Sequence, residues 1–331
     1  MNIDQLRREA VLAAEDVLAG LDLADGTKIP IFDLIEDRGI WLSFQPLERL
    51  LGIYQRVGDV AGVAINVARP LAMQRFTAAH ELGHHELGHE SHVDDETSIE
   101  GSSNDPQELQ AQTFAASLLM SELAVEAHLE RLGRDLRRPA LDPLDIYNLS
   151  VELGVSYTAA ITQLRTLSKI TQATADVAYK VAPLTLKQTL LGGRRPDNGR
   201  AAVWRLGLAD NQRSISADVG DELDIALPEM PSTGYEWTPD PTDAFASVHD
   251  WFDQTTPEAA NPAVYGDRRI RHITIKACQQ GDHTLGFRLA QPWPNGDTGA
   301  TMQIHVHVAP AQVSDVGQGI SVNQQPQLLA A

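Results

Sequence analysis

In the first half of the chain, apolar residues recur mostly at intervals of three and four, which predicts helices. The helices are expected at residues 4–21, 74–89 and 107–129, with a shorter pair at 145–152 and 157–167. A short helix ending at Gly39 is expected before a strand at 40–44, and 60–67 has the composition of a second strand. The first half is therefore expected to combine helices with a small sheet.

Beyond residue 202 apolar and polar residues alternate instead, which is the pattern of half-buried strands. The segments 219–227, 273–277, 285–289 and 304–308 are separated by turns rich in Gly, Pro and Asp. This pattern is typical of an antiparallel, all-β sandwich.

The composition changes at about residue 171, through a Thr/Ala-rich stretch and a Gly/Arg-rich one. We therefore expect a multidomain chain, with linkers in such polar stretches. The expected boundaries are a first domain at 1–170, a linker at 171–204, a second domain at 205–310 and a disordered tail at 311–331.

The charge and the cysteine content exclude several kinds of partner and metal site. The 331 residues carry 26 Lys and Arg against 45 Asp and Glu, a formal charge of -19, which argues against direct nucleic-acid binding or an anionic membrane as the main partner. The single cysteine, Cys278, excludes a zinc site built from several thiolates within the chain. No apolar run is long enough to span a membrane and the first residues lack a secretion signal, so a cytoplasmic location is expected.

The segment His80-Glu81-Leu82-Gly83-His84 has the pattern H-E-x-x-H. Residues four apart lie about 40° apart around a helix, so both imidazoles reach one ion. Zn²⁺ favours His nitrogen and carboxylate oxygen, although manganese or iron accepts the same ligands. A zinc-bound water has a lowered pKa, and Glu81 beside it is the candidate general base.

The pattern repeats at once as His85-Glu86-Leu87-Gly88-His89. The second pair lies about 140° from the first on a helical wheel, so both pairs cannot face one ion. We assign the metal to His80 and His84 and expect His85 and His89 at a solvated helix end, where the dipole favours protonated His. A second metal site at His85 and His89 is the alternative.

The third ligand is expected to be Glu108, which shares a helical face with Ala111 and Ala115. The small alanines allow this helix to approach the histidine helix closely. The alternatives are an exposed Glu108 in a first turn, or ligands from the acidic loop Asp94-Asp95-Glu96.

Together, the run 75–84, the pair Glu108 and Ala111, and the run 114–120 resemble the ImmA/IrrE family of zinc metallopeptidases. The resemblance covers roughly residues 1–170 and implies an α+β, zincin-like domain with a small helical pair. It implies His80, His84 and Glu108 as zinc ligands and Glu81 as the catalyst. It further implies an intracellular protease that cleaves helix-turn-helix repressors, and so a part in transcription regulation and stress response.

Three positions differ from the common family pattern. The family often has Glu at position 110 and Asn or Asp at position 112, where this chain has Gln110 and Gln112, and Ser121 replaces a frequent Pro. The amide of Gln112 can still orient a metal ligand.

In the second half, two loops combine turn residues with aromatics. The candidate binding residues are Pro231, Ser232, Thr233, Gly234, Tyr235, Pro292 and Trp293. These loops either form a rigid binding rim or bury Tyr235, Trp237 and Trp293 as a plug at the end of the sandwich.

The loops resemble those of chagasin-type inhibitors of papain-like cysteine peptidases, with 265–268 where a middle loop belongs and with Met230 and Gln291 as departures. The resemblance spans about 205–310 and implies an immunoglobulin-like β-sandwich, with a papain-like cysteine peptidase as partner. The leading hypothesis is thus a zinc endopeptidase whose C-terminal domain recognises or regulates. The alternatives are a cysteine-peptidase inhibitor or protein-binding module on a degenerate peptidase scaffold, loops that close over the protein's own zinc cleft, and a DNA-binding protein that uses residues 145–168.

Overall fold

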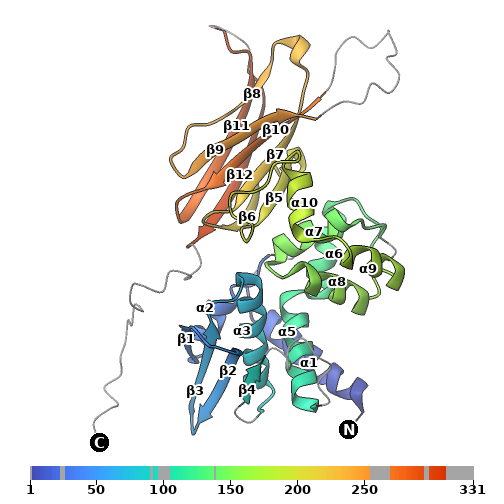
Figure 1. The fold of residues 1–331 in the computed structure, drawn as a ribbon, viewed down its shortest axis with the longest axis vertical. Helices are drawn as coiled ribbons and strands as arrows, with labels where there is room; N and C mark the ends of the chain where they lie inside the picture. The colour runs from blue at the N-terminus through green and yellow to red at the C-terminus, as the bar shows by residue number, and fades with distance from the viewer. Residues whose placement is uncertain are drawn as a thin grey trace, which may run out of the picture.

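In the computed structural model the chain folds into a helix-rich N-terminal region and a β-rich C-terminal region (Figure 1). The structure describes residues 2–22, 27–89, 92–95, 105–137, 139–253, 269–293 and 298–310. The expected tail at 311–331 lies outside these residues. Within the described part of the chain, no helix is long and apolar enough to cross a membrane.

A four-stranded sheet forms one side of the N-terminal region. Its strands are β1 (Trp41–Gln45), β2 (Leu50–Val57), β3 (Val60–Asn66) and β4 (His92–Asp95), in the order β1-β3-β2-β4. Strand β1 runs parallel to β3, and the other neighbours are antiparallel. The predictions of β1 and β3 are confirmed, whereas β2 was missed because its apolar residues are consecutive rather than alternating.

Helices α1 (Ile3–Ala19), α2 (Ile31–Asp37), α3 (Leu71–Glu86) and α5 (Pro106–Leu119) pack with this sheet around one core. The prediction of one helix over 107–129 is wrong, because the chain leaves helical geometry at Met120 and α6 (Glu122–Arg131) begins anew. Ser121 caps α6, its hydroxyl accepting a hydrogen bond of 3.2 Å from the Ala124 amide.

Four further helices complete the region: α7 (Pro143–Leu153), α8 (Tyr157–Thr166), α9 (Gln172–Tyr179) and α10 (Pro183–Leu190). The predicted helical pair is confirmed as α7 and α8, joined at Gly154 with φ of 65°. The segment expected as a linker contains α9 and α10, whose Ala175, Ala178 and Leu186 are buried in the N-terminal core.

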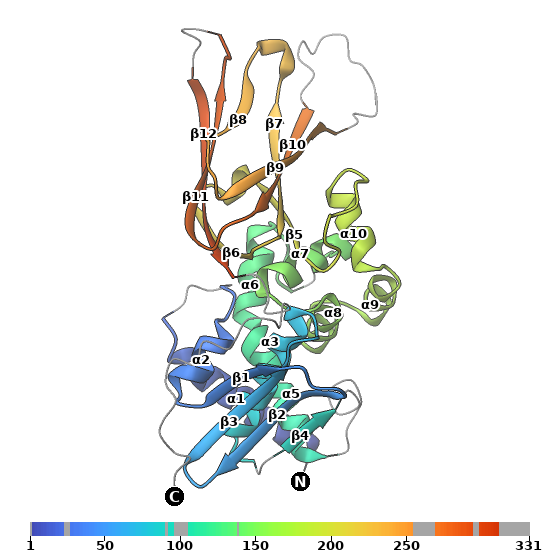
Figure 2. The same ribbon diagram turned by 60° about the vertical axis from the view of Figure 1, so that its left-hand side comes forward.

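The C-terminal region consists of two four-stranded sheets (Figure 2). One has the order β5-β7-β10-β9 and the other β6-β12-β11-β8. The strands are β5 (Val203–Gly207), β6 (Arg213–Asp218), β7 (Glu222–Glu229), β8 (Glu236–Pro239), β9 (Phe245–Phe252), β10 (Arg269–Ala277), β11 (Gly281–Ala290) and β12 (Thr298–Ala309). Apolar side chains from both sheets form a second core. The sheets are not purely antiparallel as expected, because β5 runs parallel to β7 and β6 parallel to β12.

Charged and polar contacts join the two regions. Arg213 of β6 forms an ion pair of 3.0 Å with Glu152 of α7, and the Val203 amide donates a 3.0 Å hydrogen bond to the Tyr147 hydroxyl. Lys28 pairs with Asp218 at 3.2 Å. These contacts fix how the β-rich region is attached to the helices.

Candidate metal centre

Helix α3 places the two predicted histidines side by side. Pro70 precedes its first turn, and the residues of its second half are almost all buried. His80 and His84 are fully buried, their ring centroids 4.9 Å apart and their Nε2 atoms 3.1 Å apart. Both Nε2 atoms therefore point at one place, as the spacing of four predicts.

Helix α5 supplies a carboxylate to the same place. Asp105 caps the helix, and Glu108 lies buried in its first turn. The close approach of α3 and α5 depends on Gly83, where an added Cβ would lie 3.0 Å from Phe114 Cδ1 and 3.2 Å from Ala111 Cα. The contact expected from the alanines thus also requires a glycine on α3.

The spacing of the three side chains suits a tetrahedral ion. The Glu108 carboxylate oxygens lie 3.4 Å from His80 Nε2 and 3.3 Å from His84 Nε2. Ligand atoms at about 2.0–2.1 Å from a tetrahedral zinc are about 3.3–3.4 Å from one another. His80, His84 and Glu108 are the group of buried side chains within the described residues that could hold an ion. The side chains of 94–96, the rival ligands, lie outside the described residues.

Glu81 is also fully buried, and a strand passes directly against it. A Cβ at Gly52 of β2 would lie 2.2 Å from Glu81 Oε1 and 2.5 Å from Thr77 Cγ2. Only a glycine leaves room for the carboxylate at this point of the strand. Nothing in the sequence pattern indicated that Gly52 touches Glu81.

The second histidine pair is not solvated as expected. Helix α3 ends at Glu86, and Gly88, with φ of 69°, turns the chain back so that the His89 amide donates to the His84 carbonyl at 2.9 Å. His89 is thereby buried behind His84, and burial together with the adjacent His84 lowers the pKa of His89. His85 is half-buried, with Nδ1 3.1 Å from the Tyr54 hydroxyl.

Arg75 is a buried cation that the sequence analysis did not single out as functional. Its Nε donates to the Gly154 carbonyl at 2.9 Å and its Nη2 to the Ile29 carbonyl at 2.7 Å. Burial lowers the pKa of Arg75 to about 10. The side chain ties the first half of α3 to the turn between α7 and α8.

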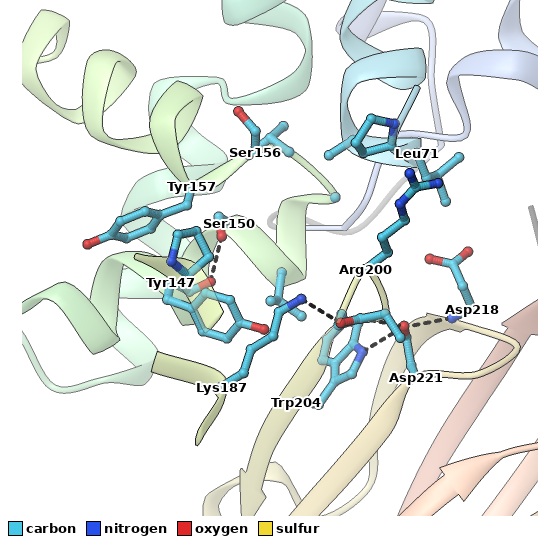
Figure 3. Close-up of a pocket in the computed structure, with 18 of the residues that line it drawn as sticks. Leu71, Tyr147, Ser150, Ser156, Tyr157, Lys187, Arg200, Trp204, Asp218 and Asp221 are labelled. Carbon is cyan, nitrogen blue, oxygen red and sulfur yellow. Dashed lines mark hydrogen bonds between the residues drawn. The ribbon is translucent and has the colours of Figure 1, made fainter. Parts of the chain in front are cut away.

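A pocket of about 470 Å³ lies at the junction of the two regions (Figure 3), and His80, His84 and Glu108 are not among the residues that line it. Lys187 donates to the carbonyls of Gly199 and Ala201 at 2.9 and 2.6 Å, and Asp221 accepts from Trp204 Nε1 at 3.1 Å. Burial raises the pKa of Asp221 to about 6. Hydrogen bonds within the junction thus hold Lys187 and Asp221 in place.

The two loops of the β-rich region lie side by side at its end remote from α3 and α5 (Figure 1). Gly234 has φ of 75°, and a Cβ there would lie 2.5 Å from Trp293 Cη2, so the indole rests on the glycine. Trp293 is 50% exposed, whereas Trp237 is buried and donates to the Pro228 carbonyl at 3.0 Å. Trp237 is therefore buried in the core between the two sheets, as one of the two expectations had it, whereas Trp293 lies at the surface. The expected middle loop at 265–268 lies outside the described residues.

Comparison with known proteins finds a matching family for each of the two regions. Residues 35–165 match the family described as IrrE N-terminal-like domain, and residues 216–308 match the chagasin family of peptidase inhibitors, I42. Amoebiasin-2 of Entamoeba histolytica is 30% identical over 98 residues, which are 29% of this chain and 76% of that protein.

Solved structures resemble the β-rich region. The cysteine protease inhibitor EhICP2 of Entamoeba histolytica is 25% identical, with 33% of this chain and 97% of that one covered and a TM-score of 0.27. PbICP-C, solved in complex with falcipain-2, is 16% identical, with 33% of this chain and 100% of that one covered and a TM-score of 0.24. By its sequence matches, the chain belongs to the chagasin family through its C-terminal region, and its N-terminal region is similar to the IrrE N-terminal-like family.

Proposed function

We propose that the N-terminal region is a zinc-dependent endopeptidase. The observation that carries the proposal is the convergence of His80, His84 and Glu108 at the spacing of tetrahedral ligands, next to the buried carboxylate of Glu81. Zinc held there supplies a Lewis acid and a water of lowered pKa. Glu81, which adjoins His80 in sequence, would accept a proton from the water activated there.

The substrate class follows from the family resemblance alone. ImmA/IrrE-type peptidases act on helix-turn-helix repressors, so we propose a regulatory protein of that kind as substrate, in the cytoplasm. The C-terminal region then serves recognition or regulation. In the structure its β7–β8 connection is remote from α3 and α5, so that loop does not cover the metal centre (Figure 2).

Elemental analysis of the purified full chain tests the metal site. We expect about one zinc per chain in the wild type, and none in His84→Ala or Glu108→Ala. His305→Ala, which removes an exposed histidine from β12, is the control that keeps its zinc. A folded wild type without bound metal would refute the proposal.

Proteolysis tests the catalyst separately. Glu81→Gln preserves the shape of the side chain but cannot take the proton, so this variant should keep its zinc and lose cleavage of a repressor substrate. Retained cleavage would exclude Glu81 as the general base.

We also infer that the C-terminal region binds a papain-like cysteine peptidase. The exposed Trp293, held against Gly234, joins the two loops into one surface next to a pocket of about 480 Å³. The membership of the chagasin family supports this function. Titration of papain with the full chain should show tight inhibition that Trp293→Ala weakens, whereas Trp41→Ala, at an equally exposed tryptophan of the N-terminal region, has no effect. Absence of inhibition would leave the β-rich region as a docking domain for another partner.

A further inference from the structure

Behind His84, away from the metal side, three more side chains continue a line of hydrogen bonds. His89 Nδ1 lies 3.0 Å from His84 Nδ1, and His89 Nε2 lies 3.2 Å from Gln110 Oε1. Gln110 Nε2 donates to Glu9 Oε2 at 3.0 Å. We call His84, His89, Gln110 and Glu9 the relay.

With Glu9 ionised and His89 neutral, every bond in the relay has one direction. An ionised carboxylate only accepts, so Glu9 requires the amide nitrogen of Gln110 to face it. The carbonyl oxygen of Gln110 then faces His89 and requires a proton on His89 Nε2. A neutral His89 has no proton left for Nδ1, which must accept from His84 Nδ1. His84 thus keeps its proton on Nδ1 and presents the lone pair of Nε2.

We propose that His89 and Gln110 are positioning residues that hold His84 in the one tautomer able to ligate the metal through Nε2. The proposal rests on the proposed zinc site and deepens it. Metal-bound histidines generally donate their second ring nitrogen to an outer partner, and loss of that partner costs about 10–100-fold in metal affinity. Here the partner of His84 is itself a histidine, His89. His89 can accept from His84 Nδ1 only if a further group holds the proton of His89 on Nε2. Gln110, oriented by Glu9, does so.

The fold places the relay through three separate elements. Gly88 allows the reversal after α3 that brings His89 under His84. Gln110 follows Glu108 by two residues on α5, so one helix supplies both a metal ligand and the outer amide. Glu9 comes from α1, which packs along α5, and its other oxygen accepts from Gln5 at 3.0 Å.

Reversing the polarity of Gln110 tests the proposal. In Gln110→Lys the ammonium group satisfies Glu9 but donates to His89 Nε2, which drives the proton of His84 onto Nε2. Zinc affinity, measured by competition with a chromophoric chelator, should fall about 10–100-fold. Gln110→Glu still accepts from His89 and should stay within about 3-fold of the wild type, because the exposed Glu9 can turn to water. Gln107→Lys adds the same charge to α5 without touching His89, and thermal unfolding of each variant monitors the fold.

A second measurement needs no metal. Long-range ¹⁵N–¹H spectra of the histidine-labelled, zinc-free full chain report which nitrogen carries each imidazole proton. We expect the proton of His84 on Nδ1 in the wild type and on Nε2 in Gln110→Lys. The proposal is overturned if His84 carries its proton on Nε2 in the wild type, or if Gln110→Lys binds zinc as tightly as Gln107→Lys. A wild type that binds no zinc would instead refute the proposed peptidase, while the spectra would still decide the relay.

Discussion

The two candidate sites of this molecule are built in opposite ways. The metal centre is buried and takes most of its groups from two helices, with His80 and Glu81 adjacent in sequence. The loop surface of the β-rich region is exposed and joins residues about sixty positions apart, at Gly234 and Trp293.

This difference determines what each site requires of its surroundings. Buried polar groups are costly unless they are paired, so the metal centre needs outer partners and close backbone contacts on every side. Gly52 and Gly83 provide the closest of these contacts. The exposed loops need only a defined shape, which Gly234 provides through a backbone conformation that other residues rarely adopt.

The largest predicted effect is at Gly52 in the buried site. In Gly52→Ala the new methyl group would lie 2.2 Å from Glu81 Oε1, so the carboxylate or the strand must move. Because a positioned general base contributes about 10²–10⁴-fold, we expect at least about 100-fold lower peptidase activity with zinc retained. The measurements are a repressor cleavage assay and zinc content.

Gly62→Ala is the matched control, since Gly62 lies in the same sheet and the nearest atom to an added Cβ, Trp41 Cβ, is 3.7 Å away. That variant should keep nearly full activity. Equal activity of the two variants would show that the contact between β2 and Glu81 does not hold the base in place.

The helix periodicity predicted which side chains of α3 and α5 converge. A spacing of four on a helix brings His80 and His84 together, and small residues on the next helix allow Glu108 to approach. The outer groups could not be found in this way. His89 depends on where α3 ends and on the turn at Gly88, which a wheel drawn through residue 89 ignores.

In the β-rich region, alternation identified β7, β10, β11 and β12. It missed β5, β6 and β8, which are shorter than the four identified strands, and also β9, and it gave no information on strand direction. Direction and neighbour choice depend on how distant segments meet, as when β6 lies parallel to β12. Turn residues next to aromatics identified the two loops as a candidate binding rim, and the resemblance to a family supported that interpretation.

The second prediction concerns the junction of the two regions and tests how much the charge of Glu152 there contributes to stability. Burial alone would raise the pKa of Glu152, but the hydrogen bond and charge of His128 and the ion pair with Arg213 outweigh it and lower the pKa to about 2. A lowered carboxyl pKa stabilises the fold above the ordinary value of 4.5, and this stability is lost as the pH falls toward 2. The shift corresponds to about 3 kcal/mol.

Denaturant unfolding of the wild type and Glu152→Gln at several pH values between 7 and 3 measures this effect. The wild type should be more stable at pH 7, and its advantage should shrink as the solution is acidified below about 4.5. Glu122→Gln, at a carboxylate that is 58% exposed and paired with Lys169, should change the stability by less than about 1 kcal/mol. A constant difference between wild type and Glu152→Gln across this range would mean that Glu152 does not hold the junction through its charge.

The smallest predicted effect concerns the exposed site, where a shape can be altered without disturbing a core. Gly234→Ala places a methyl group 2.5 Å from Trp293 Cη2, so the exposed indole must shift. Tryptophan contacts at protein interfaces often contribute about 2 kcal/mol, so the inhibition constant for a papain-like peptidase should rise about 30-fold. Gly220→Ala carries the same backbone strain, with φ of 98°, but an added Cβ meets nothing within 4 Å. Equal inhibition by the two variants would show that the position of Trp293 is irrelevant, and the loops would then bind through backbone shape alone.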